Sequence, residues 1–136
     1  MVVSRSWATA CADWELPAYI ERQFGLVGEG VPAGYKVVER EFSGQVFVRE
    51  LPTYARNHGL VLASAFQAWQ YVRDHPRAQF EHPLAVGGEG AMAFDQHELP
   101  QVLSFSCTAG RRAVHIHRQG VRLGANARLL VLEKVS

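Results

Sequence analysis

The sequence predicts an α+β protein with a mainly antiparallel sheet of about five strands and two helices packed on one face of it. Two observations predict this class. Strand-like segments cluster in the C-terminal third of the chain, whereas the two helical segments lie before Pro76. Strands that cluster, instead of alternating regularly with helices, favour α+β over α/β architecture. The strand count follows the usual size of sheets.

Length and composition limit the functional classes that remain. The 136 residues predict a single domain over 1–136, large enough to bury a core without disulfides or a structural metal. A hydrophobic content of 48% is typical of a globular chain, and a formal net charge of +1 argues against a dedicated nucleic-acid binder. No apolar run approaches the roughly 20 residues of a membrane span.

The N-terminal residues and the two cysteines predict a cytoplasmic protein. The first twelve residues hold no apolar stretch of the length that a secretory signal needs, which is about 7–15 residues. Cys11 and Cys107 are then expected to be reduced and mostly buried thiols. For Cys107, burial is expected because it falls on the apolar side of a predicted hairpin.

Residues 13–24 are predicted to form the first helix. Asp13 can accept a hydrogen bond from a free amide of the first turn. Pro17 falls early enough to be tolerated in that turn, and Gly25 can end the helix. The glycine-rich segments 25–34 and 87–90 are interpreted as loops within the domain.

A β-hairpin is predicted over residues 35–51, with its turn at Ser43-Gly44-Gln45. A three-residue loop places Glu39 opposite Arg49, which is a favourable pair of charges. A two-residue loop would mix the two faces of the hairpin, so the bulged loop is preferred.

The second helix is predicted within residues 64–75. Ser64 and Gln67 have the spacing of a capping box, in which each side chain bonds the backbone N–H of the other residue. An apolar stripe follows at helical spacing. The helix should end before Pro76, because the residue before a proline is disfavoured in the α region. The preceding segment, 53–59, fits either a helical turn or a loop.

A second hairpin is predicted from 101–107 to 112–118, turning on Ala109-Gly110. Its register places Phe105 opposite Val114 and Ser104 opposite His115. This register gives one apolar face and one mostly polar face, and a shift by one residue would destroy the separation.

The last predicted strand, residues 128–134, is apolar on both faces. Such a strand is either covered on both sides or contributes to a subunit interface. Leu130 and Leu132 are therefore candidate interface residues, and the chain is predicted to form a homodimer. Residues 84–86 can add another short strand.

The leading functional prediction is a non-enzymatic binding domain without a cofactor, because no complete catalytic set of residues is visible. Trp14, Phe66 and Trp69 fall at helix positions, where aromatic side chains are usually core but can line a ligand site when exposed. A cavity between helices and a curved sheet commonly holds a small ligand. The predicted partner is a small apolar molecule at that place, or another protein at the face or edge of the sheet.

An alternative prediction is a metal-binding protein or metal-dependent enzyme that uses His115 and His117. Side chains two residues apart on a strand project from the same face, which suits two ligands of one ion. A third ligand would have to come from elsewhere, and His97 is a candidate. The segment after His117 supplies no carboxylate that could complete the set.

A third prediction is an anion or nucleic-acid site built from C-terminal arginines. Arg112, Arg118 and Arg122 belong to a group of five arginines within residues 111–128. Guanidinium groups bind phosphates and carboxylates well. The same segment holds no aromatic residue on which bases could stack, which favours a set of solubilising charges.

Overall fold

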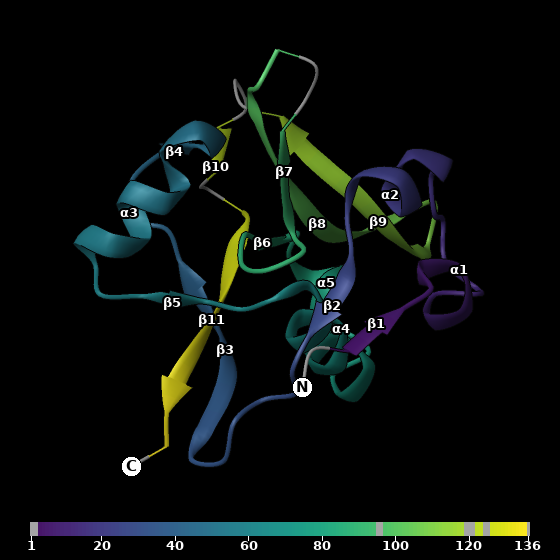
Figure 1. Cartoon of the computed structure of the whole chain (residues 1–136), viewed down its shortest axis with the longest axis horizontal. Coiled ribbons are helices and arrows are strands. Elements are labelled where there is room, and N and C mark those ends of the chain that lie inside the picture. Colours follow the sequence, from purple (N-terminus) through teal and green to yellow (C-terminus); the bar gives the residue numbers. More distant parts are fainter. Residues whose placement is uncertain (1–2, 95–96, 119–121, 124–125, 136) are drawn as a thin grey trace.

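The computed structural model describes residues 3–94, 97–118, 122–123 and 126–135 (Figure 1). These residues contain eleven short strands, five helices and one 3-10 turn, joined by loops. The helices are α1 (Trp7–Ala10), α2 (Ala18–Gln23), α3 (Leu51–Asn57), α4 (Ala65–Asp74) and α5 (Ala78–Glu81), and the 3-10 turn η1 is Val48–Glu50. The strands are β1 (Val3–Arg5), β2 (Leu26–Gly28), β3 (Tyr35–Glu41), β4 (Val46–Phe47), β5 (Val61–Leu62), β6 (Leu84–Val86), β7 (Met92–Phe94), β8 (Pro100–Thr108), β9 (Arg111–Arg118), β10 (Arg122–Leu123) and β11 (Arg128–Lys134).

Seven of the described strands form one mixed sheet. Its order is β3-β11-β6-β8-β7, with β5 also beside β11 and β9 also beside β8. Among these pairings, β6 with β11 is parallel and the others are antiparallel. The predicted combination of helices and strands is confirmed. The sheet, however, is mixed and has seven strands instead of about five, and five helices are present instead of two.

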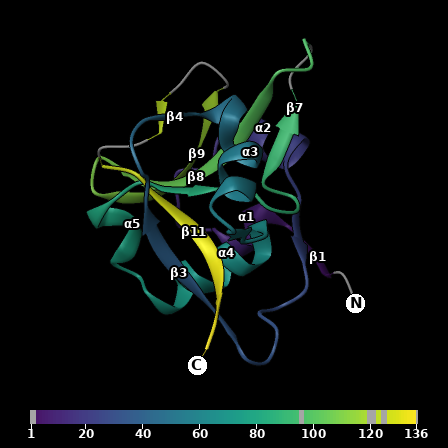
Figure 2. The same ribbon diagram turned by 90° about the vertical axis from the view of Figure 1, so that its left-hand side faces the viewer.

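Helices cover both faces of this sheet, and not one face as predicted. Successive residues of β8 alternate between two cores: Leu103 and Phe105 pack with α1, α2 and α4, whereas Val102 packs with η1 and α3. Strand β11 alternates in the same way, with Leu130 in the first core and Val131 in the second. Figure 1 shows α3 and the α1–α2 pair on opposite sides of the sheet, and Figure 2 has α3 in front of it.

The predicted hairpin over 35–51 is wrong. Strand β3 pairs along its whole length with β11, so Glu39 lies opposite Leu130 and not opposite Arg49. The short β4 pairs with β10, and the chain then turns into η1 and α3. Pro52 stands in the first turn of α3, where proline is favourable because its N–H is not needed. The ambiguous segment 53–59 is therefore mostly helix.

The first predicted helix is correct only in its second half. Helix α2 begins after Pro17, which serves as its N-cap residue, and Asp13 caps nothing. The segment before Pro17 runs beside β9, where the Glu15 N–H donates to the Arg112 carbonyl oxygen at 2.8 Å. Proline keeps the residue before it out of the α region, which explains the late start of the helix.

Helix α4 and the β8–β9 hairpin are confirmed. The Ser64 side chain accepts from the Gln67 N–H at 3.1 Å, the Ser64 N–H donates to the Gln67 side chain at 3.0 Å, and the helix ends at His75. The hairpin has the predicted register, with Ser104 opposite His115. Its turn residue Ala109 has the positive φ that the turn requires. The predicted strands at 84–86 and 128–134 are also present.

The two glycine-rich segments pack tightly against each other and against the start of α4. The Gly88 N–H donates to the Ala63 carbonyl oxygen at 3.0 Å, and the Gly25 N–H donates to that of Gly90 at 3.2 Å. A Cβ atom at Gly88 would lie 2.3 Å from the Ala63 oxygen, and one at Gly90 would lie 2.2 Å from the Gly25 oxygen. Only glycine therefore fits at these positions without movement of backbone.

No helix in the described ranges has the length and the apolar character that a membrane crossing requires.

Candidate functional site

The aromatic residues predicted to line a ligand site have separate surroundings. Trp14 is half-buried, with its ring edge-on to Phe105 at 5.8 Å and the Arg112 guanidinium 5.0 Å from its centroid. Phe66 is buried in the first core and stacks on the half-buried Trp69 at 5.9 Å. Trp69 also lines a surface hollow of about 390 Å³ beside α1. The space between helices and sheet is filled by core side chains, so the residues act mainly in packing.

The doubly apolar strand β11 is covered within its own chain. Leu130 is fully buried against the α4 side of the sheet, while Leu129 and Val131 are buried against η1 and α3. Leu132 is half-buried beside β3 and β5. The observation that suggested a homodimer is therefore explained by packing inside one chain.

The predicted histidine pair projects from one face of β9 but does not form a metal centre with other described residues. The His115 Nε2 lies 2.8 Å from the Thr108 Oγ1. His117 lies opposite Val102 of the second core, and its Nε2 is buried with no hydrogen-bond partner among the described residues. His97 is exposed before β8. Among the described residues, no group of three possible ligands lies close enough to hold a metal ion.

Burial changes the chemistry of His117. It lowers the pKa of this imidazole to about 4, and the nearby His115 contributes in the same direction. His117 is therefore neutral at physiological pH. A neutral imidazole in an apolar layer is a packing residue, and protonation of it would place a charge against the second core.

Of the three arginines predicted to bind an anion, Arg112 takes part in packing, and the side chains of the other two are not described. The Arg112 guanidinium donates to the Val72 carbonyl oxygen at 2.9 Å while it covers the Trp14 ring. Arg112 thus links β9 to α4 and is engaged. Arg118 and Arg122 lie in β9 and β10, but their side chains fall outside the described atoms.

The two cysteines differ in exposure. Cys11 is buried at the end of α1, and burial raises the pKa of its thiol to about 12, which makes it unreactive. Cys107, expected to be buried, is exposed, because it lies beyond the part of the β8–β9 hairpin that the helices cover. Both thiols are free.

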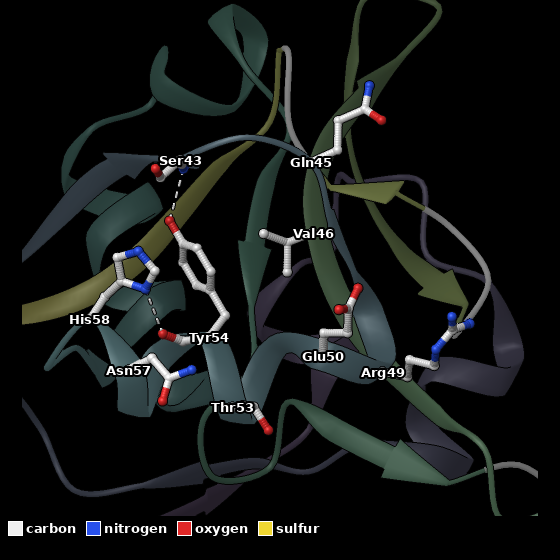
Figure 3. A pocket seen from close by; sticks show the side chains of 9 residues that line it. All are labelled: Ser43, Gln45, Val46, Arg49, Glu50, Thr53, Tyr54, Asn57 and His58. Atoms are coloured by element: carbon white, nitrogen blue, oxygen red, sulfur yellow. Dashed lines mark hydrogen bonds between the residues drawn. The ribbon is translucent and has the colours of Figure 1, made fainter.

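A hollow of about 540 Å³ lies along α3 (Figure 3). Tyr54 lines it, and its ring contacts two other rings: His58 stacks at 4.1 Å and Phe42 lies at 5.7 Å. The Tyr54 hydroxyl accepts from the Ser43 N–H at 2.9 Å. The ring and the hydroxyl of Tyr54 are thus engaged within the chain. The remaining lining residues are Gln45, Val46, Arg49, Glu50, Thr53 and Asn57.

Two further hollows lie next to each other between strand β3 and helix α4, and together we call them the β3–α4 groove. One hollow of about 470 Å³, the Val37 hollow, is lined by Val31, Tyr35 and Val37 together with the C-terminal half of α4. The other, of about 290 Å³, the Glu39 hollow, is lined by Glu39 and by the segment from Pro76 to Glu81. Tyr71 and His75 line both hollows, so these two side chains lie at the boundary between them.

Tyr71 connects the helix to the strand at the centre of this groove. Its hydroxyl donates to the Glu39 Oε2 at 2.5 Å, and its ring stacks on His75 at 4.3 Å. Burial, the hydrogen bond to Glu39 and the charges of Glu39 and Glu81 all raise the pKa of Tyr71 well above its usual value. The phenol therefore stays protonated and acts as a donor. The His75 Nδ1 lies 2.9 Å from the Tyr71 carbonyl oxygen, so that nitrogen carries the hydrogen.

Strand β3 stands at one end of the strand order, and its residues line the groove. At the other side of the sheet β7 and β9 both lie beside β8, and β9 is partly covered, because Glu15 exchanges backbone hydrogen bonds with Arg112 and Val114. No described backbone hydrogen bond outside the β11 ladder reaches residues 36–41 of β3. An unpaired edge of this kind is a template for another strand.

The groove residues were not identified as a site from the sequence. The spacing of Tyr71 and His75, four residues apart, predicts that they meet on one helix face. The sequence does not indicate that Glu39 belongs to the same site. Glu39 and Tyr71 are 32 residues apart, and their contact depends on which face of β3 lies beneath α4.

Comparison with protein-family models, with curated proteins and with solved structures gives no significant match to this chain.

Proposed function

We propose that the chain is a non-enzymatic interaction domain that binds an extended segment of a partner protein as an additional strand on β3. The main observation behind this proposal is that β3, an end strand with an unpaired edge, lies beside the β3–α4 groove. Addition of a strand supplies affinity through backbone hydrogen bonds and specificity through pockets for alternate side chains. The β3–α4 groove offers both elements.

A protein partner fits this site better than the small apolar ligand that the sequence suggested. Both hollows of the groove are open and are lined by charged residues. These are Lys36, Arg73 and Asp74 in the Val37 hollow, and Glu39, Arg77 and Glu81 in the Glu39 hollow. A small ligand site is normally concave and mostly apolar, and it buries most of its ligand. An extended peptide needs no such enclosure, since its backbone is satisfied by the strand edge.

The proposal predicts a change in amide hydrogen exchange along β3. In an antiparallel pair, alternate residues direct both N–H and C=O away from the partner strand. The outward amides of residues 36–41 are therefore expected to exchange quickly in the free protein. Peptides selected from a displayed library of random linear 12-residue sequences should slow that exchange at least tenfold when bound, because the amides gain hydrogen bonds.

The outward amides of β9 within 112–118 serve as the internal control, because Glu15 already covers part of that edge. They should change little on binding. Failure to select any peptide above background would contradict the proposal, and so would peptides whose binding protects amides elsewhere and leaves β3 unchanged.

A further inference from the structure

The β3–α4 groove has a polarity along its length. Val37 and Glu39 project from the same face of β3, the face beneath α4, because they are two residues apart. Val37 packs with the first core beside Tyr71, and Glu39 bonds the Tyr71 hydroxyl. The side chain at one end of the groove is thus aliphatic, and the side chain at the other end carries a charge.

The Glu39 hollow is acidic. Glu39 and Glu81 enter it from the strand and from the end of α5, and both lie near enough to Tyr71 to affect its ionisation. Arg77 lines the same hollow and offsets one of the two carboxylates, which leaves one in excess. Glu39 keeps its second carboxylate oxygen beyond the bond to Tyr71, and none of the described salt bridges includes Glu39 or Glu81. A cationic side chain is therefore the complement of this hollow.

The Val37 hollow favours an apolar side chain. Val31, Tyr35 and Val37 supply aliphatic and aromatic surface to its lining. Its charged residues are Lys36 and the pair Arg73 and Asp74, whose groups lie 3.1 Å apart. An apolar group placed against the three apolar residues therefore buries apolar area without separating that ion pair.

We infer that the segment bound on β3 carries an apolar residue and a lysine or arginine separated by one residue. This inference rests on the proposed strand addition. Residues at i and i+2 of an added strand share one face and lie about 6.6 Å apart, which matches the spacing of Val37 and Glu39 along β3. The apolar side chain occupies the Val37 hollow, and the cation contacts Glu39 and Glu81.

The test is a library selection repeated on charge variants. Random linear 12-residue peptides displayed on phage are selected on the wild-type protein, and the enriched sequences are aligned. An apolar-x-Lys/Arg pattern is expected. For a synthetic peptide with that pattern, Glu81→Lys and Glu39→Gln should each weaken binding by about five- to tenfold in fluorescence polarisation, because each removes an attractive charge.

The matched control is Asp13→Lys, which reverses an exposed acidic residue outside the groove. It should leave the affinity within about twofold. Circular dichroism confirms that each variant is folded, and Glu39→Gln retains an oxygen acceptor for Tyr71. Selected peptides that protect β3 but show no preference for a cation, or whose affinity is unchanged in both Glu variants, overturn this inference alone. A selection that yields no binder overturns the proposed function itself.

Discussion

A Gly88→Ala variant is expected to unfold about 10 °C below the wild-type protein, which corresponds to a loss of roughly 3 kcal/mol or more. The added Cβ would lie 2.3 Å from the Ala63 carbonyl oxygen and 2.6 Å from its carbon. These are backbone atoms next to the N-cap of α4, so neither side can move without disturbing the first core. Thermal unfolding followed by circular dichroism measures the effect.

The Gly30→Ala variant is the matched control for this prediction. A Cβ at Gly30 meets only the flexible side chain of Gln70, at 3.7 Å and beyond, and its φ is in an ordinary range. Its stability should change by no more than about 0.5 kcal/mol, because the substitution adds no clash and slightly restricts the unfolded chain. Equal melting temperatures for the two variants would show that the packing of residues 87–90 on Ala63 is absent in solution.

The glycine contact shows what kind of information the local sequence contains. A glycine-rich segment predicts a loop correctly, but the same residues occur both in mobile loops and in tightly packed connections. The two cases differ in which atoms lie close to the position that a Cβ atom would occupy. For Gly88 that is the backbone of Ala63, 25 residues earlier, and no local pattern indicates the approach.

The elements predicted correctly are those whose determinants lie within the element. The capping box of Ser64 and Gln67 defines the start of α4 by itself. The β8–β9 hairpin specifies its own register, because only one alignment separates apolar from polar residues and Ala109-Gly110 suits the turn. In both cases the deciding contacts join residues close in sequence.

The homodimer prediction depends on one assignment that the structure corrects. Val48–Leu51 is predicted as part of a strand, but it forms η1 and the start of α3, which cover the second face of the sheet. The apolar residues on that face of β11 are therefore covered within the chain. The partner of β3 was also misassigned, because β11 lies about 90 residues away while a hairpin partner was adjacent. The partner of β3 is therefore set by long-range strand pairing, which no local sequence pattern indicates.

The histidine pair illustrates a correct register with a wrong environment. His115 and His117 do share a face with Ser104 and Val102. That face is predicted to be mostly polar, but Ser104 and Val102 are almost fully buried and Val102 belongs to the second core. His117 is therefore a half-buried titratable group whose Nε2 is buried, and its contribution to stability depends on pH.

The protein is expected to lose about 3 kcal/mol of stability between pH 7 and pH 4 through His117 alone. The pKa of this imidazole is about 4 in the folded chain, compared with 6.5 in the unfolded chain. As the pH falls below 6.5, the unfolded state takes up the proton first, so unfolding becomes more favourable. The loss is complete near pH 4, because each unit of pKa difference is worth 1.36 kcal/mol. Urea titrations at intervals of half a pH unit measure the slope.

Other groups also titrate in this range, so the prediction concerns the difference between variants. His117→Leu removes the imidazole and should flatten the pH profile by the same 3 kcal/mol or so, while it changes stability at pH 7 by less than about 1 kcal/mol. His115→Leu is the control on the same strand face. It keeps most of the slope, because desolvation of His117 is the main cause of the lowered pKa and persists without His115. Identical profiles for the wild-type protein and His117→Leu would mean that the imidazole is solvated in the folded protein.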